Sequence, residues 1–262
     1  MHEDVKAYYE GYNEDIRLFR SNRSNLEFQI SVHYFDKLFS PKSRILDACA
    51  GTGAYSFYLA DKGHMVTACD LSPHHINIMK SKPDTHKLED IAVCDILDLS
   101  RFADNSFDVV LCMGALYHLH GNYDKNQAVS ECERVCKPGG IVVLAYITKI
   151  GAVLTNIQDD ASNMDRLMKF IDGYNDDLFT HNHPHEIDAI AANCRLDMLH
   201  HVGVDLIYPV SDKLNNALDE DCQKYLDFHL KVCEEPSFLG ASIHGLWIGR
   251  KLFVMENRED SH

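Results

Sequence analysis

The chain has 262 residues, with 25 Lys and Arg against 40 Asp and Glu, so its formal net charge is −15. Apolar residues make up 45% and charged residues 25%, an ordinary globular composition that excludes collagen-like, coiled-coil and wholly disordered chains. The negative charge argues against a nucleic-acid partner or an anionic membrane surface, because both require clustered Lys and Arg.

Neither a membrane span nor an export signal is expected. The longest purely apolar run, Ile141 to Ile147, is far shorter than the roughly 20 residues of a helical span. The first residues, Met1-His2-Glu3-Asp4, lack the basic and apolar stretches of a signal peptide. The nine cysteines contain no C-x-x-C pair, which favours free thiols in a reducing cytoplasm over disulfides or zinc. We therefore expect a cytoplasmic location.

The first 150 residues alternate helix-like and strand-like segments. Apolar residues four apart predict a helix over 25–39, which Pro41 ends. Further helices are predicted over 54–62, from Pro73 onward, and over 125–137, where Pro138-Gly139-Gly140 ends the last one. Short apolar runs predict strands at 44–49, 65–69, 91–94, 107–113 and 141–147. This alternation predicts an α/β fold with a doubly wound, mostly parallel sheet.

The second half of the chain is less regular. One amphipathic helix is predicted over 153–171, and the segment 180–192 reads as a loop that leads into a helix. Two final strands are predicted at 196–206 and 244–255, with a helix over 219–233 between them. Residues 257–262 are polar and read as a tail.

The first predicted strand runs directly into a glycine-containing turn over 47–53. Gly51 and Gly53 would let the backbone turn sharply and approach a ligand closely. The dinucleotide fingerprint G-x-G-x-x-G would need Gly or Ala at position 56, but the chain has Ser56 there. A pyrophosphate site is therefore disfavoured.

Carboxylates end the next two predicted strands. Asp70 follows the turn by about twenty residues, where an acid accepts both hydroxyls of a ribose. Asp95 ends the third strand, where a carboxylate can accept the amino group of an adenine ring. The fourth strand ends at Met113 and Gly114. Because parallel strands present their carboxyl ends at one edge of the sheet, all of these residues would border one crevice.

Over about residues 40–150, this ordered set resembles the motifs of class I S-adenosylmethionine-dependent methyltransferases of the bacterial small-molecule type. The motifs are Ile45-Leu46-Asp47 with Gly51-Thr52-Gly53, Asp70-Leu71-Ser72-Pro73, Asp95-Ile96, Phe107-Asp108-Val109-Val110 and Lys137-Pro138-Gly139-Gly140. The resemblance implies a Rossmann-like methyltransferase fold with a seven-stranded sheet and with N-terminal and inserted helical lid segments. It divides the chain into an N-terminal lid at 1–40, a cofactor-binding half at 41–150, an inserted cap at 151–185, a C-terminal part at 186–256 and a tail at 257–262.

The resemblance also implies S-adenosylmethionine as cofactor and assigns roles to particular residues. Asp47 would bind the amino group of the methionine moiety, directly or through water, and Asp70 would bind the ribose hydroxyls. The family pattern commonly has Gly at the position of Cys49, where a positive φ would suit cysteine badly. The implied cofactor-binding residues are Asp47, Ala48, Cys49, Gly51, Gly53, Asp70, Leu71, Asp95, Ile96, Met113 and Gly114.

His118 is the candidate catalytic base, because it follows the fourth strand and histidine titrates near neutrality. The alternative is a histidine that only packs or caps at a helix start. Tyr117 is a candidate for aromatic contact with the substrate. Tyr9 and Tyr12 lie in a segment that resembles the part of related small methyltransferases that closes over the cofactor; alternatively, they pack on the core.

The histidines at 181, 183 and 185 leave three interpretations open. They could hold a metal, line the substrate pocket, or lie in a solvated loop. No Cys or acid completes an obvious ligand set, although Glu186 is adjacent, so no metal is predicted. His181 and His183 are kept as candidates for the substrate pocket or lid.

The sequence thus predicts methyl transfer from S-adenosylmethionine to a small-molecule acceptor by in-line displacement. Holding the reactants in place would supply most of the acceleration, with possible base assistance from His118. The alternatives are a protein or RNA acceptor, a non-catalytic S-adenosylmethionine-binding module, and a nucleotide-dependent oxidoreductase, which Ser56 disfavours. The acceptor atom and the oligomeric state stay open.

Overall fold

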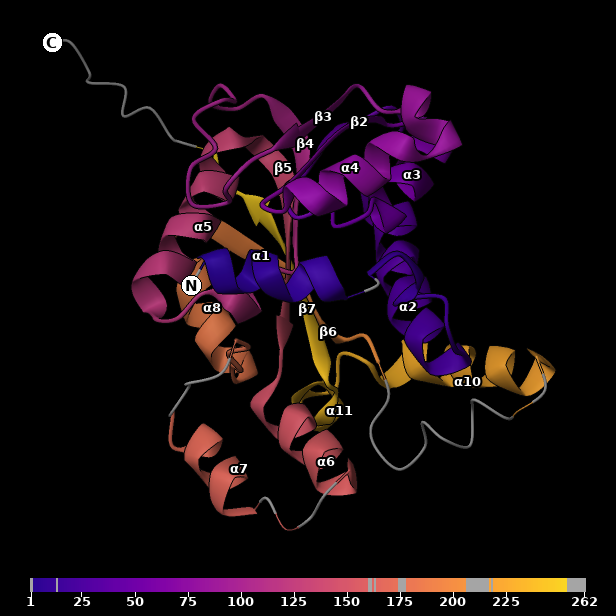
Figure 1. Ribbon diagram of the computed structural model, residues 1–262, viewed down its shortest axis with the longest axis vertical. Coiled ribbons are helices and arrows are strands. Elements are labelled where there is room, and N and C mark those ends of the chain that lie inside the picture. Colours follow the sequence, from indigo (N-terminus) through magenta and orange to yellow (C-terminus); the bar gives the residue numbers. More distant parts are fainter. Residues whose placement is uncertain are drawn as a thin grey trace, which may run out of the picture.

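The computed structural model describes residues 2–12, 14–159, 162, 164–173, 178–205, 217 and 219–253. A seven-stranded sheet in the order β3-β2-β1-β4-β5-β7-β6 runs through the molecule (Figure 1). β7 is antiparallel to both of its neighbours, and the other pairs along the sheet are parallel. The strands are β1 (Arg44–Asp47), β2 (Met65–Asp70), β3 (Asp90–Val93), β4 (Phe107–Met113), β5 (Cys136–Ile147), β6 (Leu196–Gly203) and β7 (His244–Lys251). This confirms the predicted fold class.

Helices cover both faces of the sheet (Figure 1). The α-helices are α1 (His2–Gly11), α2 (Asn22–Leu38), α3 (Ala54–Asp61), α4 (Pro73–Ser81), α5 (Asn122–Val135), α6 (Lys149–Asp159), α7 (Met164–Ile171), α8 (Pro184–Ala192), α10 (Asp219–Val232) and α11 (Pro236–Ala241). Short 3₁₀ helices are η1 (Glu14–Ile16), η2 (Pro83–Lys87) and η3 (Leu116–His118).

Successive residues of a strand pack in different hydrophobic cores, because side chains along a strand point alternately to the two faces of the sheet. Leu46 and Val110 pack in the core that α5 and α8 complete. Their chain neighbours Ile45 and Val109 pack in the core beneath α2, α3 and α10. Strands buried on both faces must be apolar at consecutive positions, which is why they read as near-continuous apolar runs in the sequence.

The sheet reverses its strand order at the β1–β4 boundary. The chain moves outward from β1 to β2 and β3, and then returns to place β4 on the other side of β1. The connections that follow β1 and β4 therefore leave in opposite directions, which opens a crevice at the carboxyl ends of these strands. Helix α1 lies across the molecule in Figure 1, between the end of the sheet where β2–β5 are labelled and the pair α6 and α7.

Two predictions for individual elements are wrong. The single helix predicted over 153–171 is two helices, α6 and α7. The sequence between them, Asp160-Ala161-Ser162-Asn163, is rich in residues that compete with helix interiors for backbone hydrogen bonds. Strand β5 begins at Cys136 rather than Ile141, because the Pro138-Gly139-Gly140 segment continues alongside β4, where the register shifts between Phe107 and Val109.

The predicted start of α4 is confirmed. Ser72 precedes α4, its Oγ accepts a hydrogen bond from the His75 backbone N–H, and Pro73 is the first helical residue. β6 and β7 end at Gly203 and Lys251, earlier than predicted, and the predicted tail at 257–262 lies outside the described residues. None of the nine cysteines forms a disulfide, and most of them are buried. No helix in the described ranges has the length and apolarity needed to cross a bilayer.

Candidate functional site

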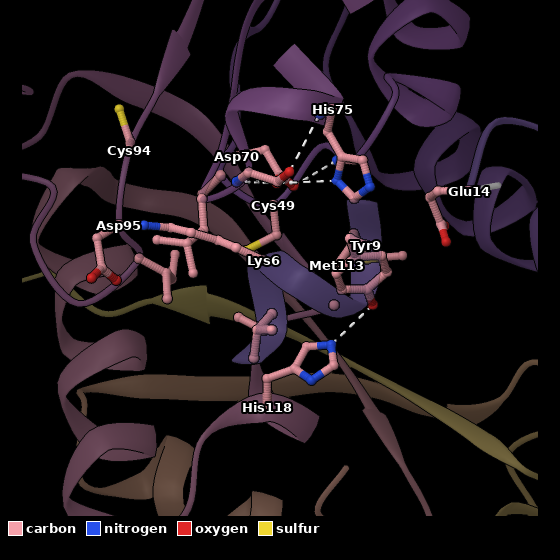
Figure 2. A pocket seen from close by; sticks show the side chains of 18 of the residues that line it. Lys6, Tyr9, Glu14, Cys49, Asp70, His75, Cys94, Asp95, Met113 and His118 are labelled. Atoms are coloured by element: carbon pink, nitrogen blue, oxygen red, sulfur yellow. Dashed lines mark hydrogen bonds and ion pairs between the residues drawn. The ribbon is translucent and has the colours of Figure 1, made fainter. Parts of the chain in front are cut away.

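A cavity of about 100 Å³ lies at the carboxyl ends of β1, β2 and β4 (Figure 2). We call it the strand-end cavity. Its wall includes Cys49, Asp70, Asp95 and Met113 from the loops and strand ends, while α1 contributes Val5, Lys6 and Tyr9. The crevice expected at the strand-order reversal is therefore present, and the N-terminal helix forms part of its wall.

Backbone N–H groups hold the Asp70 carboxylate at one side of this cavity. Gly51 N donates to Asp70 Oδ2 and Ser72 N donates to Oδ1, both at 2.8 Å. His75 Nδ1 lies 3.2 Å from Oδ1, and Figure 2 shows its ring beside the carboxylate. Gly51 has φ of +54°, a conformation that L side chains rarely adopt, so this turn requires glycine. The turn after β1 and the end of β2 are thereby joined through one carboxylate.

Asp47 lies beneath the wall rather than in it, because its side chain is fully buried. Ser56 Oγ donates to its Oδ2 at 2.6 Å, while Oδ1 is buried without a hydrogen-bond partner among the described residues. Burial, together with the nearby charge of Asp70, raises the pKa of Asp47 to about 7 and outweighs the Ser56 hydrogen bond, which lowers it. Ser56, the residue that argued against a dinucleotide site, is thus the partner of this carboxyl group.

Most of the predicted cofactor-binding residues meet in the wall of the strand-end cavity. Gly53 does not line it: with φ of +94°, it precedes α3, and a Cβ there would lie 2.8 Å from the Phe57 ring. Among the described residues, Cys49 is absent from those with positive φ, so cysteine is unstrained there. The predicted residues in the wall are Ala48, Cys49, Gly51, Asp70, Leu71, Asp95, Ile96, Met113 and Gly114.

His118 faces Tyr9 across the cavity (Figure 2). Its Nδ1 lies 3.1 Å from the carbonyl oxygen of Leu178, which can only accept, so Nδ1 carries the hydrogen. Nε2 is then the acceptor in the 2.9 Å hydrogen bond from the Tyr9 hydroxyl. Burial lowers the pKa of His118 to about 4, so the imidazole is neutral at pH 7. Burial also raises the pKa of Tyr9 well above its usual range, so its phenol keeps the proton.

A second cavity, of about 560 Å³, adjoins the first, and we call it the outer cavity. Tyr9, Glu14, Arg17 and Tyr117 line both cavities. The outer cavity is rich in aromatic rings, because Tyr8, Tyr12 and Phe179 also line it. The Tyr8 and Tyr12 rings stack at 5.5 Å, and Tyr8 meets Phe179 edge-on at 5.4 Å. Three of the predicted lid or substrate residues, Tyr9, Tyr12 and Tyr117, thus lie at this junction.

The predicted histidine cluster lies elsewhere. His181 and His183 line neither cavity. His183 precedes α8, where its backbone N–H donates to Glu186 at 2.7 Å, and its ring stacks on His185 at 5.3 Å. Within the described part of the chain, no group of three or more His, Cys, Asp or Glu could hold a metal. A substrate or lid role for His181 and His183 stays a prediction.

Sequence reasoning missed several residues of the cavity walls. Arg17 is held between two acids: its Nε donates to Glu14 at 2.7 Å, and its two terminal nitrogens donate to Glu27 at 2.8 and 3.1 Å. The one local sign of this ion pair in the sequence was the spacing of three residues between Glu14 and Arg17, which brings two side chains together on a helical turn. Ser72 belongs to the Asp70 motif and His75 lies just beyond it, but neither was assigned to the site. Among the other missed residues, Lys6 and Cys94 had no distinguishing pattern.

Residues 46–144 match the family model described as Methyltransferase domain. Over 133 residues the chain is 31% identical to the ubiquinone biosynthesis O-methyltransferase of Xanthomonas campestris pv. campestris strain B100, covering 49% of this chain and 53% of that protein. It is 35% identical over 103 residues to the putative methyltransferase YqeM of Bacillus subtilis, covering 39% of this chain and 41% of that one. The chain thus spans about half the length, or less, of these curated relatives.

Solved structures share the fold over almost the whole chain. A geranyl diphosphate methyltransferase in complex with GPP and sinefungin aligns with a TM-score of 0.63 at 13% identity, covering 96% of this chain and 99% of that one. The PH0226 protein of Pyrococcus horikoshii aligns with a TM-score of 0.61 at 16% identity, covering 94% and 99%. At these identities the likeness concerns the fold alone.

Proposed function

The chain contains a class I S-adenosylmethionine-dependent methyltransferase domain, and from this premise we propose that it methylates a small organic acceptor. S-adenosylmethionine is the methyl donor of this family. The observation that carries the proposal is the pair of adjoining cavities at the strand-order reversal, with α1 in the walls of both. Concave pockets of this kind suit a small molecule better than an extended macromolecular surface.

The residues of the strand-end cavity fit S-adenosylmethionine. Asp47 Oδ1 is a buried acceptor without a partner among the described residues, which suits a group that donates, such as an ammonium or a water bound to it. Gly114 has φ of +137°, and a Cβ there would lie 2.9 Å from the Tyr117 hydroxyl, so the wall is kept open where the two cavities adjoin. We assign Asp70 to the ribose hydroxyls, Asp95 to the adenine amino group, and Asp47 to the methionine amino group.

When bound, the cofactor supplies a methyl group on a positively charged sulfur. The chain's own contribution is to hold the acceptor against that methyl group, which removes most of the entropy cost of the encounter. We assign the acceptor to the outer cavity, because this cavity shares Tyr9, Tyr117, Glu14 and Arg17 with the strand-end cavity. We assign α1, within the lid at 1–40, to excluding water from the strand-end cavity, and the segment 151–185 to capping the acceptor.

His118 serves as the base in this proposal. Its Nε2 lone pair accepts from Tyr9, in the position that an acceptor hydroxyl or amine would take. A pKa of about 4 makes it a weak base, but an oxygen that gains a methyl group becomes strongly acidic, so a weak base suffices. The positive charge lost by the sulfur is regained by the imidazole, so the net charge of the cavities does not change during transfer.

The test is transfer of a labelled methyl group from S-adenosylmethionine into a cell extract separated into small-molecule, protein and RNA fractions. We expect label in the small-molecule fraction. Label only in protein or RNA would refute the acceptor class. S-adenosylmethionine binding without label in any fraction would indicate a non-catalytic module.

A further inference from the structure

Two cationic groups of the outer cavity have hydrogen-bond donors without a partner among the described residues. Arg20 is exposed in the wall and forms no hydrogen bond or ion pair with the described residues. His244 uses its backbone N–H and its Nδ1 on Asp205, while its Nε2 has no partner in the described part of the chain. The His244 side chain is 25% exposed.

The acids of the same wall are already occupied. Both oxygens of Glu27 accept from Arg17, and Glu14 accepts from Arg17 Nε. Asp205 Oδ1 accepts from the backbone N–H groups of Ile243 and His244 at 2.8 and 3.0 Å, and its Oδ2 lies 2.6 Å from His244 Nδ1. Among the described contacts, five of the six carboxylate oxygens of these acids thus already accept hydrogen bonds, whereas the donors of Arg20 and His244 Nε2 do not take part.

His244 lies between two carboxylates, because its Nδ1 is also 3.8 Å from Glu27. Burial alone would lower the pKa of His244, but Glu27 and Asp205 outweigh burial and hold the pKa above its usual value. The charges of Arg17, Arg20 and a protonated His244 then balance those of Glu14, Glu27 and Asp205. A singly charged anion would add one negative charge beside two cations whose donors are unused.

His118 and the cationic groups line different cavities, with the shared tyrosines beside His118. Tyr9 and Tyr117, which line both cavities, lie against His118, with ring centroids 5.5 and 4.8 Å from its imidazole. Arg20 and His244 line only the outer cavity. Tyr8, Tyr12 and Phe179 provide aromatic surfaces in the outer cavity, and the Phe179 ring lies 4.8 Å from the His118 imidazole, which favours stacking of a planar molecule beside His118.

We propose that the methyl acceptor is a planar, aromatic or conjugated molecule that carries a carboxylate, and that Arg20 and His244 bind this carboxylate. The guanidinium fork matches the two oxygens of a carboxylate. The nucleophilic atom would lie at the other end of the molecule, beside His118. This inference rests on the proposed function, since it names the substrate class of the same site.

The experiment measures binding by calorimetry to protein already saturated with S-adenosylhomocysteine. The probes are 4-hydroxycinnamate, its methyl ester and 4-hydroxycinnamylamine, which share a planar body and differ in charge. We expect the acid to bind about tenfold more tightly than the ester and the amine, as one charge-assisted hydrogen bond provides.

Arg20→Gln should remove this preference and Arg20→Lys should keep part of it. Arg101→Gln is the matched control, because Arg101 pairs with Asp90 and lines neither cavity, so it should leave the preference unchanged.

Equal or tighter binding of the ester or the amine would overturn the inference. So would absence of saturable binding by the acid, or an unchanged preference in Arg20→Gln. The preceding titration with S-adenosylhomocysteine separates the two proposals. If it fails, the proposed function is wrong; if it succeeds and the acid is not preferred, only the substrate class is wrong.

Discussion

His118 is a buried imidazole whose charge and tautomer are both set by its neighbours. Burial lowers its pKa to about 4, and this effect outweighs the hydrogen bond to Leu178 and the charge of Asp70, which both favour the protonated form. The Leu178 carbonyl fixes the hydrogen on Nδ1, so Nε2 keeps its lone pair throughout the neutral pH range. A surface histidine would instead lose and gain its proton near pH 6.5.

Substitution of His118 tests the base role. We expect His118→Gln to lower kcat by about 100-fold or more, the usual contribution of general-base catalysis, while S-adenosylmethionine binding changes little. Because the pKa is lowered, wild-type kcat at saturating cofactor and acceptor should show no titration of His118 between pH 6 and 9. His120→Gln is the control, since His120 lines neither cavity. Unchanged turnover in His118→Gln across this pH range would exclude the base role.

Asp47 gives the binding step its own pH dependence. Its pKa is raised to about 7, so the carboxyl group is mostly protonated at pH 6 and mostly ionised at pH 8. Only the ionised form attracts an ammonium group, so S-adenosylmethionine should bind up to about tenfold more tightly at pH 8 than at pH 6. Asp47→Asn should bind more weakly and without this dependence. A wild-type affinity that is flat or that falls as pH rises would contradict the role.

Local sequence patterns located Asp70, Asp95 and His118 because each lies at a fixed offset from a recognisable strand. The burial of Asp47 beneath the wall could not be predicted, because it depends on how α3 places Ser56 over it. The contact between η1 and the Gly51 turn is likewise tertiary: the nearest atom to a Cβ at Gly51 would be Glu14 Cγ, at 3.5 Å. No local pattern joins residues so far apart in the chain.

Among the elements, α1 is the one whose position controls access to the cofactor. It is a ten-residue helix with most of its side chains partly or fully exposed; Val5 is its one fully buried residue among those whose burial is described. Helices this short are marginal in isolation, so α1 depends on its contacts for stability. Those contacts include the Tyr9–His118 hydrogen bond and the edge-on packing of Tyr9 on His75 at 4.9 Å.

Hydrogen exchange measures this dependence. S-adenosylhomocysteine should slow amide exchange across α1, because a ligand in the strand-end cavity adds contacts to Val5, Lys6 and Tyr9. Helix α8 lines neither cavity and should exchange at the same rate with and without the ligand. Equal exchange in α1 under both conditions would show that this helix is not a lid over the cofactor.

For the molecule as a whole, the junction between β5 and β7 joins the parallel part of the sheet to β6. Gly245 lies opposite Tyr146 in this antiparallel pair, and the Tyr146 hydroxyl is 2.8 Å from His201 Nε2 on β6. A Cβ at Gly245 would lie 2.3 Å from the Tyr146 ring. The fully buried tyrosine thus requires glycine on the neighbouring strand.

Gly245→Ala should lower the free energy of unfolding by about 1–3 kcal/mol, the usual cost of overpacking a core. For a chain of this size the melting temperature should fall by several degrees, at roughly 2–4 °C per kcal/mol. Gly240→Ala is the matched control, because a Cβ there meets no atom within 4 Å, and its melting temperature should stay level or rise slightly. Equal melting temperatures for the two variants would contradict the packing argument.

The overall topology was the most predictable feature. Runs such as Ile45-Leu46 and Val109-Val110 are apolar at successive positions because both faces of the sheet are covered, and this pattern alone indicates parallel strands. The outer cavity was not predictable, because Arg20, Phe179 and His244 come from three distant parts of the chain. The three histidines at 181–185 suggested a ligand or substrate site by their composition alone. The described contacts of His183 and His185 are instead those of a helix start.

Calorimetric titration with S-adenosylmethionine tests the central claim most directly. We expect saturable binding of one molecule per chain, lost or weakened by at least about tenfold in both Asp70→Ala and Asp70→Asn, because the ribose would lose a charged hydrogen-bond acceptor. Asp197→Ala removes an exposed carboxylate on β6, away from both cavities, and should bind like the wild type. Absence of S-adenosylmethionine binding, or tight binding of NADH in its place, would contradict the claim.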